Sequence, residues 1–78
     1  MPECPENLTP RQWEVALLIA EGLTNPEIAG RLYVERSTVE SHVHALLDKL
    51  ELQHRTQIAV WVERKIHETM DASDGGTL

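Results

Sequence analysis

The residue types that could bind a metal or carry out catalysis in this chain are four histidines, one cysteine and scattered carboxylates. His42 and His44 lie two positions apart, and on a helix such side chains diverge too far to share a metal ion. His54, His67 and Cys4 are isolated from them, so no zinc site is predicted. Cys4 has no fixed base nearby, and no glycine-rich loop follows a strand. We therefore expect neither enzymatic activity nor a cofactor.

Size and composition support that expectation. The chain has 78 residues, enough for one domain, and a domain this short buries only about 60% of the surface of its unfolded chain. Its single cysteine excludes an internal disulfide and favours a reducing cytoplasm. The longest apolar run, residues 15–20, is far too short to cross a membrane. The acidic, proline-rich first residues lack the features of a signal peptide.

The charge balance is acidic, which is unusual for a protein that binds nucleic acid. Seven Lys and Arg face thirteen Asp and Glu, a formal net charge of −6. Four of the acids, Glu3, Glu6, Asp71 and Asp74, lie near the ends of the chain. Without these four, nine acids face seven bases, a net charge of −2. The central part is therefore close to neutral, and the local sign of its surface matters more than the total.

Two short motifs mark where the first two helices begin. In Thr9-Pro10-Arg11-Gln12 and in Thr24-Asn25-Pro26-Glu27, a threonine precedes a glutamine or glutamate by three positions, the pattern of a capping box. Proline is compatible with these positions because the first N–H groups of a helix have no helical partner. The first helix is expected to run to about Glu21, where Gly22 ends it. The second is expected to end at residue 32 or 33.

Aliphatic residues at helical spacing predict two longer helices further along the chain. The third follows a tight turn and spans residues 36–50, with apolar positions Val39, Val43, Leu46, Leu47 and Leu50. The fourth runs from a Thr56 cap to about Met70, with apolar positions Ile58, Ala59, Val62 and Ile66. No segment alternates with a period of two for long enough to form a strand. The expected fold class is therefore all-α, a bundle of four helices.

The domain limits follow from these elements. We expect a flexible lead at residues 1–7, one domain at 8–70 and a disordered polar tail at 71–78. The third helix turns a mixed polar face away from its aliphatic stripe, made of Thr38, Glu40, Ser41, His44, Ala45 and Asp48. His42 and Lys49 flank the stripe.

The second and third helices, joined by a tight turn, are the parts of a helix-turn-helix. From Leu8 to Ile66, without gaps, the chain resembles the LuxR/GerE-type helix-turn-helix, the output domain of many bacterial response regulators and quorum sensors. The stretches that carry the resemblance are Leu8-Thr9-Pro10-Arg11, Glu14-Val15, Ile19-Ala20-Glu21-Gly22-Leu23-Thr24-Asn25, Glu27-Ile28-Ala29, Arg31-Leu32, Thr38-Val39, His42-Val43, Leu46-Leu47, Lys49-Leu50 and Arg55-Thr56-Gln57.

The resemblance implies a bacterial transcription regulator, or its output domain, whose recognition helix at 36–50 lies in the major groove of duplex DNA. Base edges would be contacted by Thr38, Glu40, Ser41, His44 and Ala45. Phosphates would be contacted by Thr24, Asn25, Arg36, His42, Lys49 and Arg55. A homodimer would form through helix 56–70, at Val60, Trp61, Arg64 and Lys65. RNA polymerase or another regulator is a further candidate partner, and no small-molecule ligand or membrane contact is expected.

Departures from the family pattern leave an alternative open. Glu40 occupies a position where the family usually has a basic residue. The family often has a basic residue at the position of Pro26, asparagine at that of Ala45 and glycine at that of Glu51. Glu40 would repel phosphate, or it would accept a hydrogen bond from cytosine N4. The alternative function is a protein-binding helix-turn-helix module whose acidic recognition helix docks a basic partner and has weak or no affinity for DNA.

Several single residues also allow two interpretations. Trp61 is either an exposed dimer contact or a ring lying flat on its own helix, whereas Trp13 is expected in the core. Glu35 replaces the usual serine cap of the third helix, so either Glu35 stabilises the helix start electrostatically or Ser37 caps it. Arg55 contacts phosphate or pairs with Glu51. His42 and His44 would bind phosphate better when protonated, which predicts some pH dependence.

Overall fold

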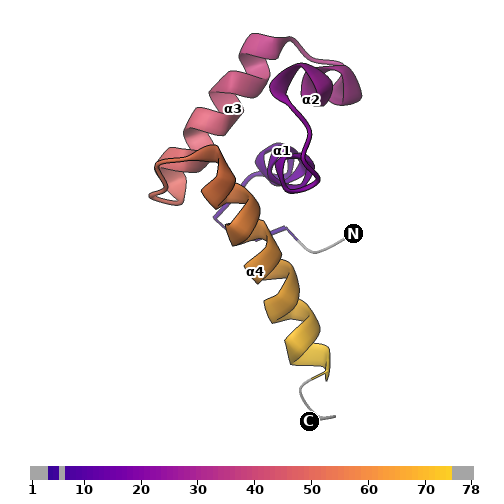
Figure 1. The fold of residues 1–78 in the computed structure, drawn as a ribbon, viewed down its shortest axis with the longest axis vertical. Helices are drawn as coiled ribbons and strands as arrows, with labels where there is room; N and C mark the ends of the chain where they lie inside the picture. Colours follow the sequence, from indigo (N-terminus) through magenta and orange to yellow (C-terminus); the bar gives the residue numbers. More distant parts are fainter. Residues whose placement is uncertain (1–3, 6, 75–78) are drawn as a thin grey trace.

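The computed structural model describes residues 4–5 and 7–74, with only the backbone given for 69–74. Within these residues it contains four helices and no strand: α1 (Pro10–Ala20), α2 (Asn25–Leu32), α3 (Arg36–Lys49) and α4 (Arg55–Asp74). α3 and α4 are the two longer helices, and α1 lies beside both of them (Figure 1). This arrangement confirms the predicted all-α, four-helix fold. None of these helices is both long enough and apolar enough to cross a membrane.

The starts of α1 and α2 are closed by the two predicted capping boxes. The Thr9 hydroxyl accepts from the Gln12 N–H at 3.1 Å, and the Gln12 side chain accepts from the Thr9 N–H at 3.1 Å. At α2, the Thr24 hydroxyl accepts from the Glu27 N–H at 3.3 Å, and Glu27 Oε1 accepts from the Thr24 N–H at 2.8 Å. Gly22 follows α1 with a φ of +94°, the left-handed conformation that glycine adopts without strain.

The start of α4 differs from the prediction. Thr56 does not cap this helix, because α4 already begins at Arg55. The Gln57 side chain instead accepts from the backbone N–H groups of Gln53 and His54, each at 2.8 Å. This amide oxygen satisfies donors ahead of the helix, so the helix begins at Arg55, before the expected Thr56 cap. α4 also continues to Asp74, four residues beyond the expected end at Met70.

The predicted tail and lead lie only partly within the described residues. Residues 71–74 of the predicted tail belong to α4, and residues 75–78 lie outside the described part of the chain. Within the predicted lead, only Cys4, Pro5 and Asn7 are described. The domain limits at 8 and 70 therefore stay predictions.

The core lies where α1 packs against α3 and α4, and α2 closes it by packing chiefly on α3. Trp13 is only 2% exposed, as expected for a core residue. Its ring meets Trp61 of α4 edge to face, with centroids 6.1 Å apart and planes at 85°. The other buried hydrophobic residues are Leu8, Val15, Ala16, Leu18, Ile19, Ile28, Ala29, Val39, Val43, Leu46, Ile58 and Val62. The aliphatic contacts fix how α3 faces the solvent.

Candidate nucleic-acid interface

The exposed face of α3 is set by three buried side chains on its other side. Val39, Val43 and Leu46 recur at helical spacing and pack into the core. The helix therefore cannot rotate without exposing aliphatic surface. The predicted base-contacting positions lie on the outward side as expected: Thr38, Glu40, Ser41 and His44 are exposed, and Ala45 is half-buried.

An ion pair joins two residues near the start of this face. Arg36 Nε lies 3.4 Å from Glu40 Oε2, one turn along the helix, and both side chains are well exposed. An exposed pair at this spacing contributes only about 0.3–0.5 kcal/mol. The pair holds the Arg36 guanidinium along the helix surface, and a phosphate could replace Glu40 as its partner at small cost.

The start of α3 has no side-chain cap. Glu35 occupies the N-cap position, but its side chain makes no capping hydrogen bond. Ser37 lies within the first turn, so the alternative in which Ser37 caps the helix is wrong. The Glu35 backbone carbonyl accepts from the N–H groups of Thr38 and Val39, at 3.0 and 3.2 Å, while its side chain is exposed to solvent.

The start of α2 is linked to the start of α4 by Arg55. One Arg55 amino group donates to the Asn25 side-chain oxygen, and the other donates to the Leu23 carbonyl at 2.5 Å. Burial lowers the pKa of Arg55, yet a guanidinium stays charged at any ordinary pH. The suggested pairing of Arg55 with Glu51 is not formed. Two predicted phosphate contacts, Asn25 and Arg55, are thus brought together across thirty residues of sequence.

The first turn of α2 offers little positive potential of its own. Hydrogen bonds from the Thr24 backbone N–H, and then from its side chain, lower the pKa of the Glu27 carboxyl and keep it ionised. Pro26 has no N–H, and the capping box already uses those of Thr24 and Glu27. Among the described residues, the Asn25 N–H is the donor of this turn that the cap does not engage.

The far end of α3 is tied to α1. Lys49 Nζ donates to the Gln12 side-chain oxygen at 3.0 Å, the same oxygen that accepts from the Thr9 N–H. Gln12 is itself 9% exposed. Sequence reasoning identified Gln12 only as a cap, because nothing in its local pattern indicates a contact with a residue of α3. His42 lies half-buried at the margin of the same helix.

Basic groups near α3 do not form a continuous band. Arg36 lies at one end and Lys49 at the other, and carboxylates alternate with them. The charged residues of the helix and its immediate flanks are Glu35, Arg36, Glu40, Asp48, Lys49 and Glu51. The electrostatic attraction for a phosphate backbone is therefore concentrated at the two ends of the helix.

Tyr33 is a surface residue that sequence reasoning did not select. It lies in the turn between α2 and α3, is 95% exposed and has a φ of +57°, with its N–H donating to the Ala29 carbonyl. A bulky residue in the left-handed conformation is uncommon. The sequence feature that could have identified Tyr33 as an exposed residue is its aromatic side chain in a turn of only a few residues.

The predicted dimer residues on α4 have different surroundings. Val60 and Arg64 are exposed. Trp61 is half-buried and packs on Trp13 of α1, so neither interpretation of its ring describes it fully. Lys65 Nζ lies 5.6 Å from the Trp61 ring centroid and 3.5 Å from Glu68 Oε2.

The fold and this polar face define a class of protein. A short α2, a tight turn and a rigidly held α3 with an exposed polar face form a helix-turn-helix domain, the class of fold that places its second helix in the major groove of DNA. Residues 6–62 match the family model described as bacterial regulatory proteins, luxR family. The chain therefore belongs to the luxR family of bacterial regulatory proteins, which favours DNA binding over a module that binds only protein.

The curated relatives that the chain matches are transcription and response regulators. It is 46% identical over 59 residues to the transcriptional regulatory protein LiaR of Bacillus subtilis, covering 76% of this chain and 28% of LiaR. It is 47% identical over 58 residues to the nitrate/nitrite response regulator protein NarL of Escherichia coli K12, covering 74% of this chain and 27% of NarL. It is also 46% identical over 59 residues to the response regulator protein VraR of Staphylococcus aureus, covering 76% of this chain and 28% of VraR. The chain thus spans little more than a quarter of their length.

Proposed function

We propose that this domain reads duplex DNA by placing α3 in the major groove, as a homodimer paired through α4, and that it acts in the cytoplasm, without catalysing a reaction. The observation that carries the proposal is the exposed polar face of α3, held in place by Val39, Val43 and Leu46. The major groove admits an α-helix and displays a different hydrogen-bonding pattern for each base pair. Base edges are contacted by Thr38, Glu40, Ser41, His44 and Ala45.

Phosphate contacts flank this face at both ends. Arg36 leaves Glu40 for a phosphate near the start of α3, and Lys49 with His42 binds the backbone along the other side. Arg55 and Asn25 contribute from the junction of α2 and α4, together with the Thr24 turn. The guanidinium of Arg55 has five N–H donors, of which the contacts with Asn25 and Leu23 leave several for phosphate. Phosphate contacts set the register of the helix, and base contacts select the sequence.

Pairing through α4 compensates for an acidic monomer. A net charge of −6 weakens attraction to phosphate, and two domains on half-sites about 34–36 Å apart double the number of contacts. Val60 and Arg64 are exposed on α4, and Trp61 and Lys65 border them. In sedimentation, V60D should weaken self-association. V60D is a cleaner test than W61A, because Trp61 also packs on Trp13. A wild-type chain that stays monomeric at high concentration would rule out this interface.

The DNA contacts are tested by selecting bound duplexes from a random pool at low and moderate salt. We expect enrichment of one motif, in paired half-sites, and loss of that preference in S41A and H44A. R36Q should weaken binding to all sequences alike, because a phosphate contact carries no sequence information. A pool without enrichment, or no retained DNA at low salt, would refute the proposal.

A further inference from the structure

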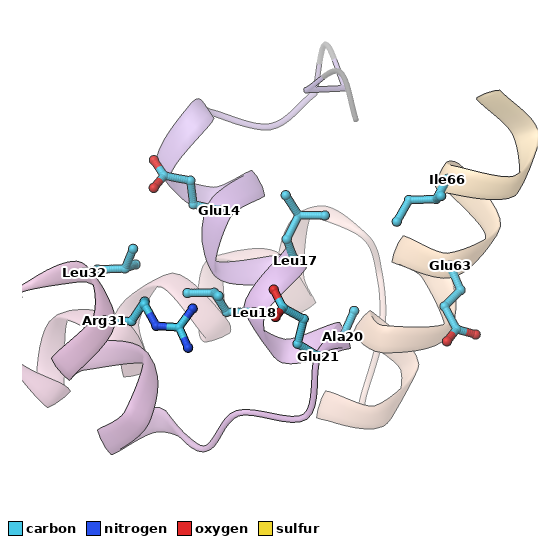
Figure 2. Close-up of a pocket in the computed structure, with 9 residues that line it drawn as sticks. All are labelled: Glu14, Leu17, Leu18, Ala20, Glu21, Arg31, Leu32, Glu63 and Ile66. Carbon is cyan, nitrogen blue, oxygen red and sulfur yellow. The ribbon is translucent and has the colours of Figure 1, made fainter. Parts of the chain in front are cut away.

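An apolar groove lies on the side of the domain formed by α1, the end of α2 and the middle of α4. Its volume is about 560 Å³, and none of the residues that line it belongs to α3. Leu17 of α1 and Ile66 of α4 point toward the space between these helices, and Leu32 of α2 lies across from them (Figure 2). These three aliphatic side chains are half-buried, so the groove leaves them partly in contact with water.

Charged groups around this groove are mainly carboxylates. Glu14, Glu21 and Glu63 border it, with Arg31 as the single cation among the lining residues. Glu14 already forms an ion pair, because its Oε2 lies 3.8 Å from Arg11 Nη1. Glu21 and Glu63, by contrast, form no ion pair with any residue in the described part of the chain, and both are exposed. The groove therefore combines an aliphatic floor with two unpaired acids at its border.

We propose that this groove docks an amphipathic helix of another protein, with aliphatic side chains on its buried face and Lys or Arg on its flanks. A helix of this kind inserts apolar side chains three or four positions apart into a groove of this composition. Its basic flanks meet Glu21 and Glu63, which supply charge complementarity and orientation.

Other occupants fit the groove less well. Duplex DNA would place phosphates against three carboxylates. A second copy of this chain carries a net charge of −6 and would meet the same repulsion. A small-molecule ligand needs a few polar groups directed into its pocket, whereas the floor here is aliphatic and the polar groups lie at the border.

This docking surface is independent of the DNA interface. The groove shares no residue with α3, so a helix bound there leaves the recognition face accessible. DNA binding and partner binding would thus occur on one domain at the same time. Failure of either proposal leaves the other standing, because different residues carry each.

The test uses the isotope-labelled 78-residue chain and a designed peptide of about 15 residues, long enough to populate a helix. The peptide carries leucines at every third or fourth position and lysines on both flanks. Amide shifts in the NMR spectrum should change along α1, at the end of α2 and in the middle of α4. A peptide with serines in place of the leucines should not bind. Changes centred on α3, or no saturable binding, would overturn the proposal.

Variants of the border separate specific docking from general attraction to an acidic protein. The double variant E21Q/E63Q should weaken the affinity for the peptide about two- to tenfold, as expected for the loss of two exposed ion pairs. E51Q removes a carboxylate outside the groove and should change affinity less than twofold. Equal effects of the two changes would refute the charge argument. L17S should abolish binding, and if it instead dissolves a dimer seen in sedimentation, the occupant is a second copy and the proposal is wrong.

Discussion

One turn joins α2 to α3, and the starts of these two helices are built in opposite ways. At α2, Thr24 and Glu27 bind each other's backbone N–H groups, and the helix start is satisfied internally. At α3, Glu35 provides no side-chain cap, and the charged pair Arg36–Glu40 lies along the first turn. The capped start contributes stability, whereas the uncapped start carries a charged pair whose side chains are exposed to solvent. The helix that is proposed to enter DNA is thus the one whose start is not stabilised locally.

Among changes at the starts of α2 and α3, the largest expected effect is on the affinity for DNA. E40K replaces the acid of the Arg36–Glu40 pair by a cation on the exposed face of α3. General affinity should rise about tenfold at low salt, and the dependence on salt should become steeper, because added phosphate contacts release counterions. Gel shifts over a series of salt concentrations measure both quantities.

E63K is the matched control for that change. It alters the net charge equally, but Glu63 lies on α4 at the border of the groove rather than on α3. A comparable gain from E63K would mean that total charge, and not the position of Glu40, governs affinity. Unchanged affinity in E40K would place Glu40 away from the phosphates.

Removing the cap of α2 should cost stability. T24A deletes the hydroxyl that accepts from the Glu27 N–H, and loss of an N-cap typically costs about 1 kcal/mol of the free energy of unfolding. Urea unfolding followed by circular dichroism measures the difference. T56A serves as the control, because Thr56 lies inside α4 and is not its cap. A T24A chain as stable as the wild type would show that the capping box contributes nothing.

Supplying the missing cap of α3 should have a smaller, opposite effect. E35S places a hydroxyl at the N-cap position, where it can accept from an N–H of the first turn. We expect the free energy of unfolding to rise by about 0.5–1 kcal/mol. The same urea unfolding experiment measures this change. A loss of stability in E35S would mean that the Glu35 charge stabilises the helix start more than a hydroxyl does.

The smallest expected effect is a change in pH dependence. The pKa of Glu27 is lowered in the folded state from its ordinary value of 4.5, so its contribution is complete above that value and is lost as the pH falls through the folded pKa. E27Q should therefore flatten the loss of stability on acidification below about pH 4.5. Unfolding midpoints measured between neutral and acidic pH test this. An unchanged slope would mean that the carboxylate is not stabilised by Thr24.

Two sets of interactions show what the sequence by itself determined. The starts of α1 and α2 follow from groups three residues apart, because each capping box closes within a single turn and needs no distant partner. The outward side of α3 follows from the spacing of Val39, Val43 and Leu46, since one buried stripe defines the opposite face. The luxR-type fold, the exposure of Thr38, Glu40, Ser41 and His44, and the position of Trp13 were therefore predictable.

Only the tertiary structure decided the contacts between helices. Arg55 meets Asn25, Lys49 meets Gln12, and Trp61 meets Trp13, all across many residues of sequence. The groove of α1, α2 and α4 likewise exists only where three helices leave their aliphatic side chains partly uncovered. Such features depend on the angles and distances at which helices pack, and these are set by the whole core rather than by any local pattern. Local hydrogen bonds placed the helices along the chain, and packing determined which of their side chains act together.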